Sequence, residues 1–243
     1  DPEPIVKILK NIHNKVIAKP YKIFTACSKT SLENKIDTFK ELEHSNEQKL
    51  IKPSTSQIAW FTGSQVCYCA EAFQSVPREH EDAPVLSVLA AVLKWGYLHR
   101  SIREKGGAYG AGATNDTSTN TFKFYSYRDP ECMETFNAFQ NSINWAKNSI
   151  ASQNLEEAIL DVISSIDKPL SPVGEAKNDF NYNLQKIDIA ERLEMRQKII
   201  NCSIKDLERA NEKYLTKSSS KSILAGESYK NQAVDLKLKP FKV

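Results

Sequence analysis

The hydrophobic pattern of the first part of the chain predicts a helix over residues 4–18. A short strand over 21–27 and a second helix from about residue 31 follow it, and the polar, proline-containing segment 43–56 is typical of a linker. Residues 8–33 resemble residues 206–231 as a helix, a lysine-bearing turn and a strand. The first copy would then close a preceding, related domain, unless the likeness is only that of any two helix–turn–strand units.

The pattern of the second part predicts two strands around Gly63 and Ser64, in "QIAWFTG" and "QVCYCAEAF". A long helix begins at Asp82, whose side chain suits an N-cap, and continues to about Glu104, where two glycines stop it. The order β-β-α-β-β-α-α-α-α-β is completed by strands over 107–115 and 121–128, by helices over 131–149, 154–166, 173–199 and 203–215, and by a last strand, "KSILAGE".

Composition excludes several classes of protein. The 33 basic and 30 acidic residues leave a net charge of only +3, which argues against nucleic-acid or anionic-membrane binding. No stretch approaches the roughly 18–20 apolar residues that span a membrane. The chain starts with Asp, not Met, and opens with no signal peptide, so we expect a piece of a longer protein.

Motifs for several chemistries are missing. The histidines (His13, His44, His80 and His99) form neither His-Glu-x-x-His nor its inversion, so no metal site is expected in this chain. Gly-x-Ser-x-Gly is also absent. The five cysteines (Cys27, Cys67, Cys69, Cys132 and Cys202) contain no Cys-x-x-Cys pair. We interpret them as buried thiols in a reducing compartment, with Cys67 and Cys69 on one face of a strand.

Four of the eight glycines lie between Gly106 and Gly112. This cluster leads from a helix into a strand, whereas a phosphate-binding loop leads from a strand into a helix. Gly106 and Gly107 suit a helix end with φ > 0. On the predicted strand, Gly110 and Gly112 share one face and Tyr109 and Ala111 the other. With Arg103 in the last helical turn, the segment is either a peptide- or carboxylate-recognising corner or merely a structural bend.

Four segments carry a family resemblance: "LHRSIREKGGAYGAGA" (98–113), "FKFYSYRDP" (122–130), "INWAK" (143–147) and "DKPLSPVGEA" (167–176). They resemble the C-terminal region of the presequence protease, or falcilysin-like, branch of the pitrilysin–insulinase family of inverted-motif zinc metalloproteases. The resemblance implies an α+β, two-layer domain of the pitrilysin and mitochondrial-processing-peptidase type, with a largely antiparallel sheet packed on helices. Residues 1–45 would end the third of four homologous domains, 46–55 would be a linker, and 56–243 would be the fourth domain.

The resemblance also implies a function. Members are zinc metalloendopeptidases (hydrolases) that degrade short unstructured peptides, and their first domain carries the zinc and His-x-x-Glu-His. The fourth domain supplies an Arg and a Tyr that reach the substrate across a closed chamber. These two residues match Arg103 and Tyr109 here. Gly106, Gly107 and Gly110 would leave room for the peptide. Phe124 and Tyr125 or Tyr127 would line the chamber wall, unless they pack in the core of the sheet.

This chain contains no His-x-x-Glu-His, so we expect the fragment alone to bind no catalytic zinc and to be inactive. Its expected partners are peptides and the N-terminal half of the same polypeptide, with neither nucleic acid nor membrane. The compartment would be organellar (a mitochondrion or a plastid-like organelle) or cytoplasmic. The alternative is a non-catalytic binding or assembly module of the same fold, like the core subunits of respiratory complexes.

Overall fold

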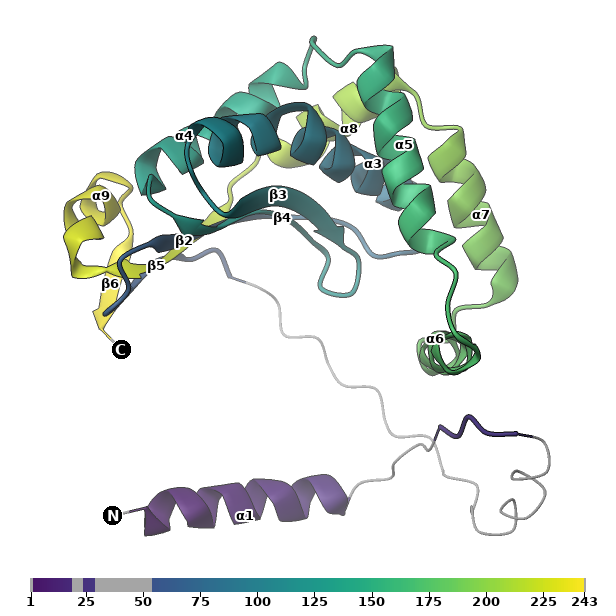
Figure 1. Ribbon diagram of the computed structural model, residues 1–243, viewed down its shortest axis with the longest axis horizontal. Coiled ribbons are helices and arrows are strands. Elements are labelled where there is room, and N and C mark those ends of the chain that lie inside the picture. The colour runs from purple at the N-terminus through teal and green to yellow at the C-terminus, as the bar shows by residue number, and fades with distance from the viewer. Residues whose placement is uncertain (1, 19–23, 29–53, 243) are drawn as a thin grey trace. The chain divides into compact units, whose positions relative to one another are not determined.

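A computed structural model describes residues 2–18, 24–28 and 54–242 of the chain (Figure 1). The chain divides into two compact units. The first combines residues 1–52 with 169–188, and the second combines residues 53–168 with 189–243. Within the described ranges, no helix is both long enough and apolar enough to cross a bilayer.

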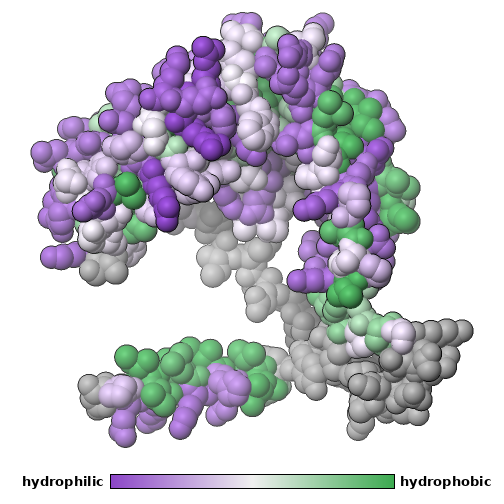
Figure 2. Space-filling view, in the orientation of Figure 1, coloured by the Kyte–Doolittle hydropathy of each residue, from purple (hydrophilic) through white to green (hydrophobic). Residues whose placement is uncertain are grey.

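The first unit contains α1 (Glu3–Ile17), as predicted, and α6 (Pro172–Leu184). No residue of α1 is buried, and apolar side chains gather along it in Figure 2. The predicted strand over 21–27 is wrong for its described residues, because 24–27 form no regular structure. There the Phe24 ring lies 5.6 Å from Phe180 of α6. The predicted helix from residue 31 and most of the linker 46–55 fall outside the described residues.

A six-stranded sheet organises the second unit, in the order β3-β4-β2-β5-β1-β6. The contacts β3/β4, β4/β2 and β2/β5 are antiparallel, and β5/β1 and β1/β6 are parallel. The first five strands confirm the predicted ones, whereas the sequence reading missed β6. The strands are β1 (Gln57–Thr62), β2 (Cys67–Gln74), β3 (Gly110–Asp116), β4 (Thr121–Asp129), β5 (Ser220–Gly226) and β6 (Lys239–Lys242).

Helices cover one face of this sheet, which confirms the predicted α+β fold. In Figure 1, α3, α4 and α8 lie over the sheet, and α5 and α7 stand side by side beyond one end of it. The long helix from residue 83 consists of α3 and the π-helical η2, which follows it without a break. The helical segments of this unit are α3 (Ala83–Leu93), η2 (Lys94–Lys105), α4 (Cys132–Trp145), α5 (Ser152–Ile166), α7 (Ile189–Ile200), α8 (Ile204–Leu215), η3 (Glu227–Tyr229) and α9 (Lys230–Asp235).

The predicted single helix over 173–199 is wrong. It is two helices, α6 and α7, separated by residues 185–188. Lys186 there has φ +55°, a left-handed backbone that an α-helix cannot contain, and the Ile187 amide turns back to the Tyr182 carbonyl. Apolar residues continue at helical spacing on both sides of residues 185–188, so the hydrophobic pattern alone does not reveal the break.

The core lies between the sheet and its helices. Ten of the eleven residues of α3 are buried, as expected for a helix that is apolar on all sides. Phenylalanine rings join α4 to the sheet: Phe124 stacks on Phe139 at 5.3 Å and meets Phe73 edge-on at 6.0 Å. Phe124 is therefore a core residue and not part of a chamber wall.

Asp82 is the N-cap residue of α3, as predicted, but its side chain holds the helix start through an ion-pair network rather than through a capping hydrogen bond. The fully buried Asp82 side chain makes no hydrogen bond to its own helix. Its Oδ1 lies 2.7 Å from Arg209 Nη2, and its Oδ2 accepts from Lys213 Nζ at 2.7 Å and from the Tyr214 hydroxyl at 2.6 Å. These three partners belong to α8. Asp82 thus ties the first turn of α3 to α8.

Asp82→Asn is expected to lower the free energy of unfolding by about 2 kcal/mol near pH 7, the typical loss for hydrogen bonds to a charged group. Burial by itself raises the pKa of the Asp82 carboxyl, but the α8 side chains outweigh burial and hold that pKa well below its usual range. The stabilisation is therefore complete above the unfolded pKa of about 3.9 and is lost as the pH falls through the folded value. Urea unfolding at pH 7, 5 and 3 measures the difference, which shrinks only below about pH 4.

Asp167→Asn is the matched control, because Asp167 is paired with Arg196 at 2.7 Å but both side chains are exposed. Solvent screens an exposed pair, so its loss is expected to change the free energy of unfolding much less than the loss of the buried Asp82 network. Equal losses in the two variants would contradict the role given to the buried Asp82.

Candidate functional site

The turn between η2 and β3 is built by two glycines with different roles. Gly107 has φ +77°, as predicted, and its amide bonds to the Arg103 carbonyl at 3.1 Å. Gly106 has φ −82°, an ordinary helical value, so the expectation that Gly106 also has φ > 0 is wrong. A Cβ on Gly106 would instead lie 2.7 Å from the Ile102 carbonyl oxygen. Gly106 is required for space and Gly107 for backbone conformation.

Arg103 is exposed in the last turn of η2, as expected. Its Nη1 donates to His99 Nε2 at 3.2 Å, and His99 Nδ1 lies 3.3 Å from Glu104 Oε1. A neutral imidazole that accepts at Nε2 and donates from Nδ1 satisfies both contacts. The ring is also packed against Trp95, at 5.5 Å between centroids. Sequence reasoning gave His99 no role, yet it orients the guanidinium.

Tyr109 emerges directly after the turn. It precedes β3 and is 63% exposed, whereas Ala111 is only 8% exposed, so the expectation that these two share a strand face is wrong. The Tyr109 amide donates to the Arg128 carbonyl at 3.2 Å, and its ring lies 5.5 Å from the Tyr127 ring. Arg128 has φ +48°, which is uncommon for a residue other than glycine, and its guanidinium lies 5.7 Å from the Tyr109 ring.

Gly110 and Gly112 make room for tyrosines of β4. They pair with Tyr127 and Tyr125 across the β3/β4 ladder. A Cβ on Gly110 would collide with the Tyr127 ring, and one on Gly112 would lie 2.9 Å from the Tyr125 hydroxyl. The expectation that Gly110 leaves space for a peptide is therefore wrong. The space is filled by side chains of the protein itself.

The sheet face opposite the buried core carries an exposed apolar row, of which the sequence pointed only to Tyr127. Tyr68 of β2 pairs with Leu224 of β5, which pairs with Trp60 of β1. Trp60 stacks on Phe241 of β6 at 5.0 Å. Tyr68, Leu224, Trp60 and Tyr127 are each 37–39% exposed. Strand alternation signalled these residues, because each neighbours buried positions along its strand.

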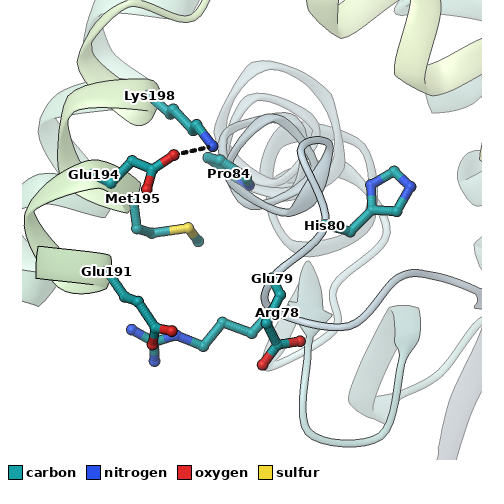
Figure 3. Close-up of a pocket in the computed structure, with 8 residues that line it drawn as sticks. All are labelled: Arg78, Glu79, His80, Pro84, Glu191, Glu194, Met195 and Lys198. Atoms are coloured by element: carbon teal, nitrogen blue, oxygen red, sulfur yellow. Dashed lines mark ion pairs between the residues drawn. The ribbon is translucent and has the colours of Figure 1, made fainter. Parts of the chain in front are cut away.

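A well-formed pocket lies elsewhere, at the other end of the α3–η2 helix (Figure 3). Its volume of about 150 Å³ is below the roughly 300–1,000 Å³ of small-molecule sites. Glu194 and Lys198 pair across one turn of α7 at 2.6 Å. His80 points away from this pair in Figure 3, and its Nδ1 accepts from the Asp82 amide at 3.0 Å. The lining residues are Arg78, Glu79, His80, Pro84, Glu191, Glu194, Met195 and Lys198.

A catalytic zinc ion does not fit the described residues. Such a site has three protein ligands, commonly His and Glu, and an open position for water. Among the described residues, the only group of three or more potential ligands is Cys67, Cys69 and Cys132. All three are buried thiols, and the hydrogen bonds among them raise the pKa of Cys67 and of Cys69 and lower that of Cys132. Cys27 is exposed, so the interpretation of every cysteine as buried is wrong for that residue.

Known sequences identify the relatives of this chain. Residues 63–224 match the family described as PreP C-terminal domain. The chain is 37% identical over 187 residues to the mitochondrial presequence protease of Drosophila melanogaster, covering 76% of this chain and 18% of that protein. The Saccharomyces cerevisiae protein of that name is 34% identical over 174 residues, covering 70% and 17%. The chain thus spans less than a fifth of the length of these relatives.

Solved structures with low sequence identity share the fold. A protease from Helicobacter pylori has a TM-score of 0.63 at 17% identity, covering 82% of this chain and 53% of that one. The peptidase M16 inactive domain from Pseudomonas fluorescens has a TM-score of 0.60 at 15% identity, covering 74% and 46%. A chain of Complex III2 from Candida albicans has a TM-score of 0.64 at 15% identity, covering 86% and 56%. The chain belongs to the PreP C-terminal domain family and corresponds to the C-terminal part of presequence proteases.

Proposed function

We propose that this chain is the substrate-binding, C-terminal part of a zinc metalloendopeptidase that degrades short unstructured peptides. The observation that carries the proposal is the corner at Gly106 and Gly107, which exposes a guanidinium and a phenol on either side of one turn. The catalytic zinc and its ligands lie outside this chain, in the N-terminal half of the polypeptide. The mitochondrial relatives favour a mitochondrial location.

Arg103 and Tyr109 suit recognition of a peptide backbone. Both side chains are hydrogen-bond donors, and both are held by rigid elements. Arg103 lies on η2 and contacts His99, and the Tyr109 amide is bound by the Arg128 carbonyl at the end of β4. A charged and a neutral donor aimed at one carbonyl stabilise the oxyanion that forms when the peptide bond is attacked. The exposed apolar row from Tyr127 to Trp60 offers side-chain contacts to an extended peptide on the same sheet.

We also propose the domain division. Residues 56–243 form the fourth domain, residues 1–45 end the third, and 46–55 connect them. The support is α1, whose Ile5, Ile8 and Leu9 are each more than half exposed. An apolar helix side of this kind is stable in water only when another part of a domain covers it.

A non-catalytic binding or assembly module is the second candidate. Its support is the likeness in fold to the inactive peptidase domain from Pseudomonas fluorescens and to a chain of Complex III2. The fold is common to both candidates, so only the side chains at the corner discriminate between them. A module without catalysis needs neither Arg103 nor Tyr109.

In the full-length protein, Arg103→Ala and Tyr109→Phe are each expected to lower kcat/KM for a short fluorogenic peptide by about 10²–10³-fold, because each removes one donor to the developing oxyanion. Arg100→Ala and Tyr97→Phe are the matched controls: Arg100 is an exposed arginine of the same η2, and Tyr97 packs against Trp145 at 5.9 Å. Unchanged turnover in both test variants would contradict the catalytic role proposed for Arg103 and Tyr109. Equal losses in tests and controls would point to misfolding instead.

The 243-residue chain alone is expected to cleave none of the same peptides, because the described residues contain no catalytic zinc site. Peptide hydrolysis by the purified chain, assayed with and without added zinc, checks this. Hydrolysis that a chelator abolishes and zinc restores would show that the chain carries its own catalytic centre.

A further inference from the structure

Three cysteines from separate elements converge in the core of the second unit. Cys67 and Cys69 are two residues apart on β2, with a bulge between them, and Cys132 is the first residue of α4. Because β4 pairs antiparallel with β2, Asp129 at the end of β4 lies opposite Cys67. The short turn after Asp129 then brings Cys132 to the same place.

The three sulfur atoms are spaced for a shared metal ion. All lie within 4.8 Å of one another, and the Cys67 and Cys69 Sγ atoms are 3.7 Å apart. Metal–thiolate bonds of about 2.3 Å place two ligands of one ion roughly 3.8–4.0 Å apart. The side chains therefore need to move by less than about an ångström. Ordinary packing of small apolar residues does not require three thiols in one place.

The surroundings hold this arrangement in position. The Cys67 thiol donates to the Asp129 carbonyl at 3.1 Å. The buried Asp129 carboxylate accepts from the Glu131 amide at 2.9 Å and from the Thr135 hydroxyl at 2.6 Å, which fixes the turn that leads to Cys132. Asp129 is thus engaged twice and is no free ligand. Cys132 stands at the N-terminus of α4, where the helix dipole favours a thiolate.

The donor set selects the metal. It consists of sulfur alone, and among the described residues no His, Asp or Glu side chain completes it. Structural Zn²⁺ takes four ligands, whereas soft thiolates select Cu(I). We propose that Cys67, Cys69 and Cys132 form a buried three-coordinate site for one Cu(I) ion. On binding, ligating thiols release their protons to solvent as the metal–sulfur bonds form, and no electron is transferred.

The test uses the 243-residue chain, reduced and loaded anaerobically with Cu(I) in the presence of a chromogenic Cu(I) chelator. The expected result is one Cu(I) retained per chain, with X-ray absorption showing only sulfur neighbours. Cys69→Ser and Cys132→Ser are expected to weaken the affinity at least tenfold. Cys202→Ser is the matched control, because Cys202 is buried but lies outside the cluster.

Three outcomes would overturn the site: no copper held against the chelator, equal retention by Cys132→Ser and the wild-type chain, or nitrogen and oxygen neighbours of the copper. X-ray absorption on the wild-type chain needs no variant, so it decides the question even where a serine substitution prevents folding. Circular dichroism of the metal-free variants identifies that case.

Discussion

The burial of α3 on every side sets the position of nearly everything that concerns function. The helix packs between the sheet and the helices α5, α7 and α8, and the Asp82 network ties its first turn to α8. A helix held in this way cannot rotate or slide without exposing apolar surface, at a cost of roughly 25 cal/mol for each Å². The η2 helix continues it, so the last turn of η2, with Arg103, is delivered to the edge of the sheet beside β3.

The corner at Gly106 and Gly107 fixes the position of Tyr109 relative to Arg103 at the end of η2. Because Gly107 takes a left-handed conformation and the Ala108 amide returns to the Ile102 carbonyl at 3.1 Å, the chain reverses within three residues. Tyr109 is then held by the Arg128 carbonyl at the end of β4. Functional groups on rigid elements keep a geometry that loops do not. The tyrosines of β4 fill the space above Gly110 and Gly112, so the neighbourhood of Tyr109 is aromatic rather than empty.

Hydrophobic periodicity was sufficient to predict five strands and most of the helices, because their apolar residues recur at the spacing of one strand or helix face. It failed where the decisive interaction is not local. Asp82 has the sequence context of an N-cap, but its partners are 127 or more residues away on α8. The break at Lys186 lies inside a continuous apolar pattern. Arg103, Gly106, Gly107 and Tyr109 were found from a motif, whereas His99 and Arg128 contribute through contacts that spacing does not reveal.

The end of β4 links the two chemical features of the domain. Arg128 receives the Tyr109 amide, the next residue, Asp129, receives the Cys67 thiol, and Pro130 receives the Tyr229 hydroxyl at 3.3 Å. These three consecutive carbonyls form one short segment, strained at Arg128 and anchored in the core at Asp129. A strained backbone persists only where its surroundings over-determine it. A metal ion on the three cysteines would take from Cys67 the proton that it donates to the Asp129 carbonyl, and the carbonyl that positions Tyr109 is one residue from that point.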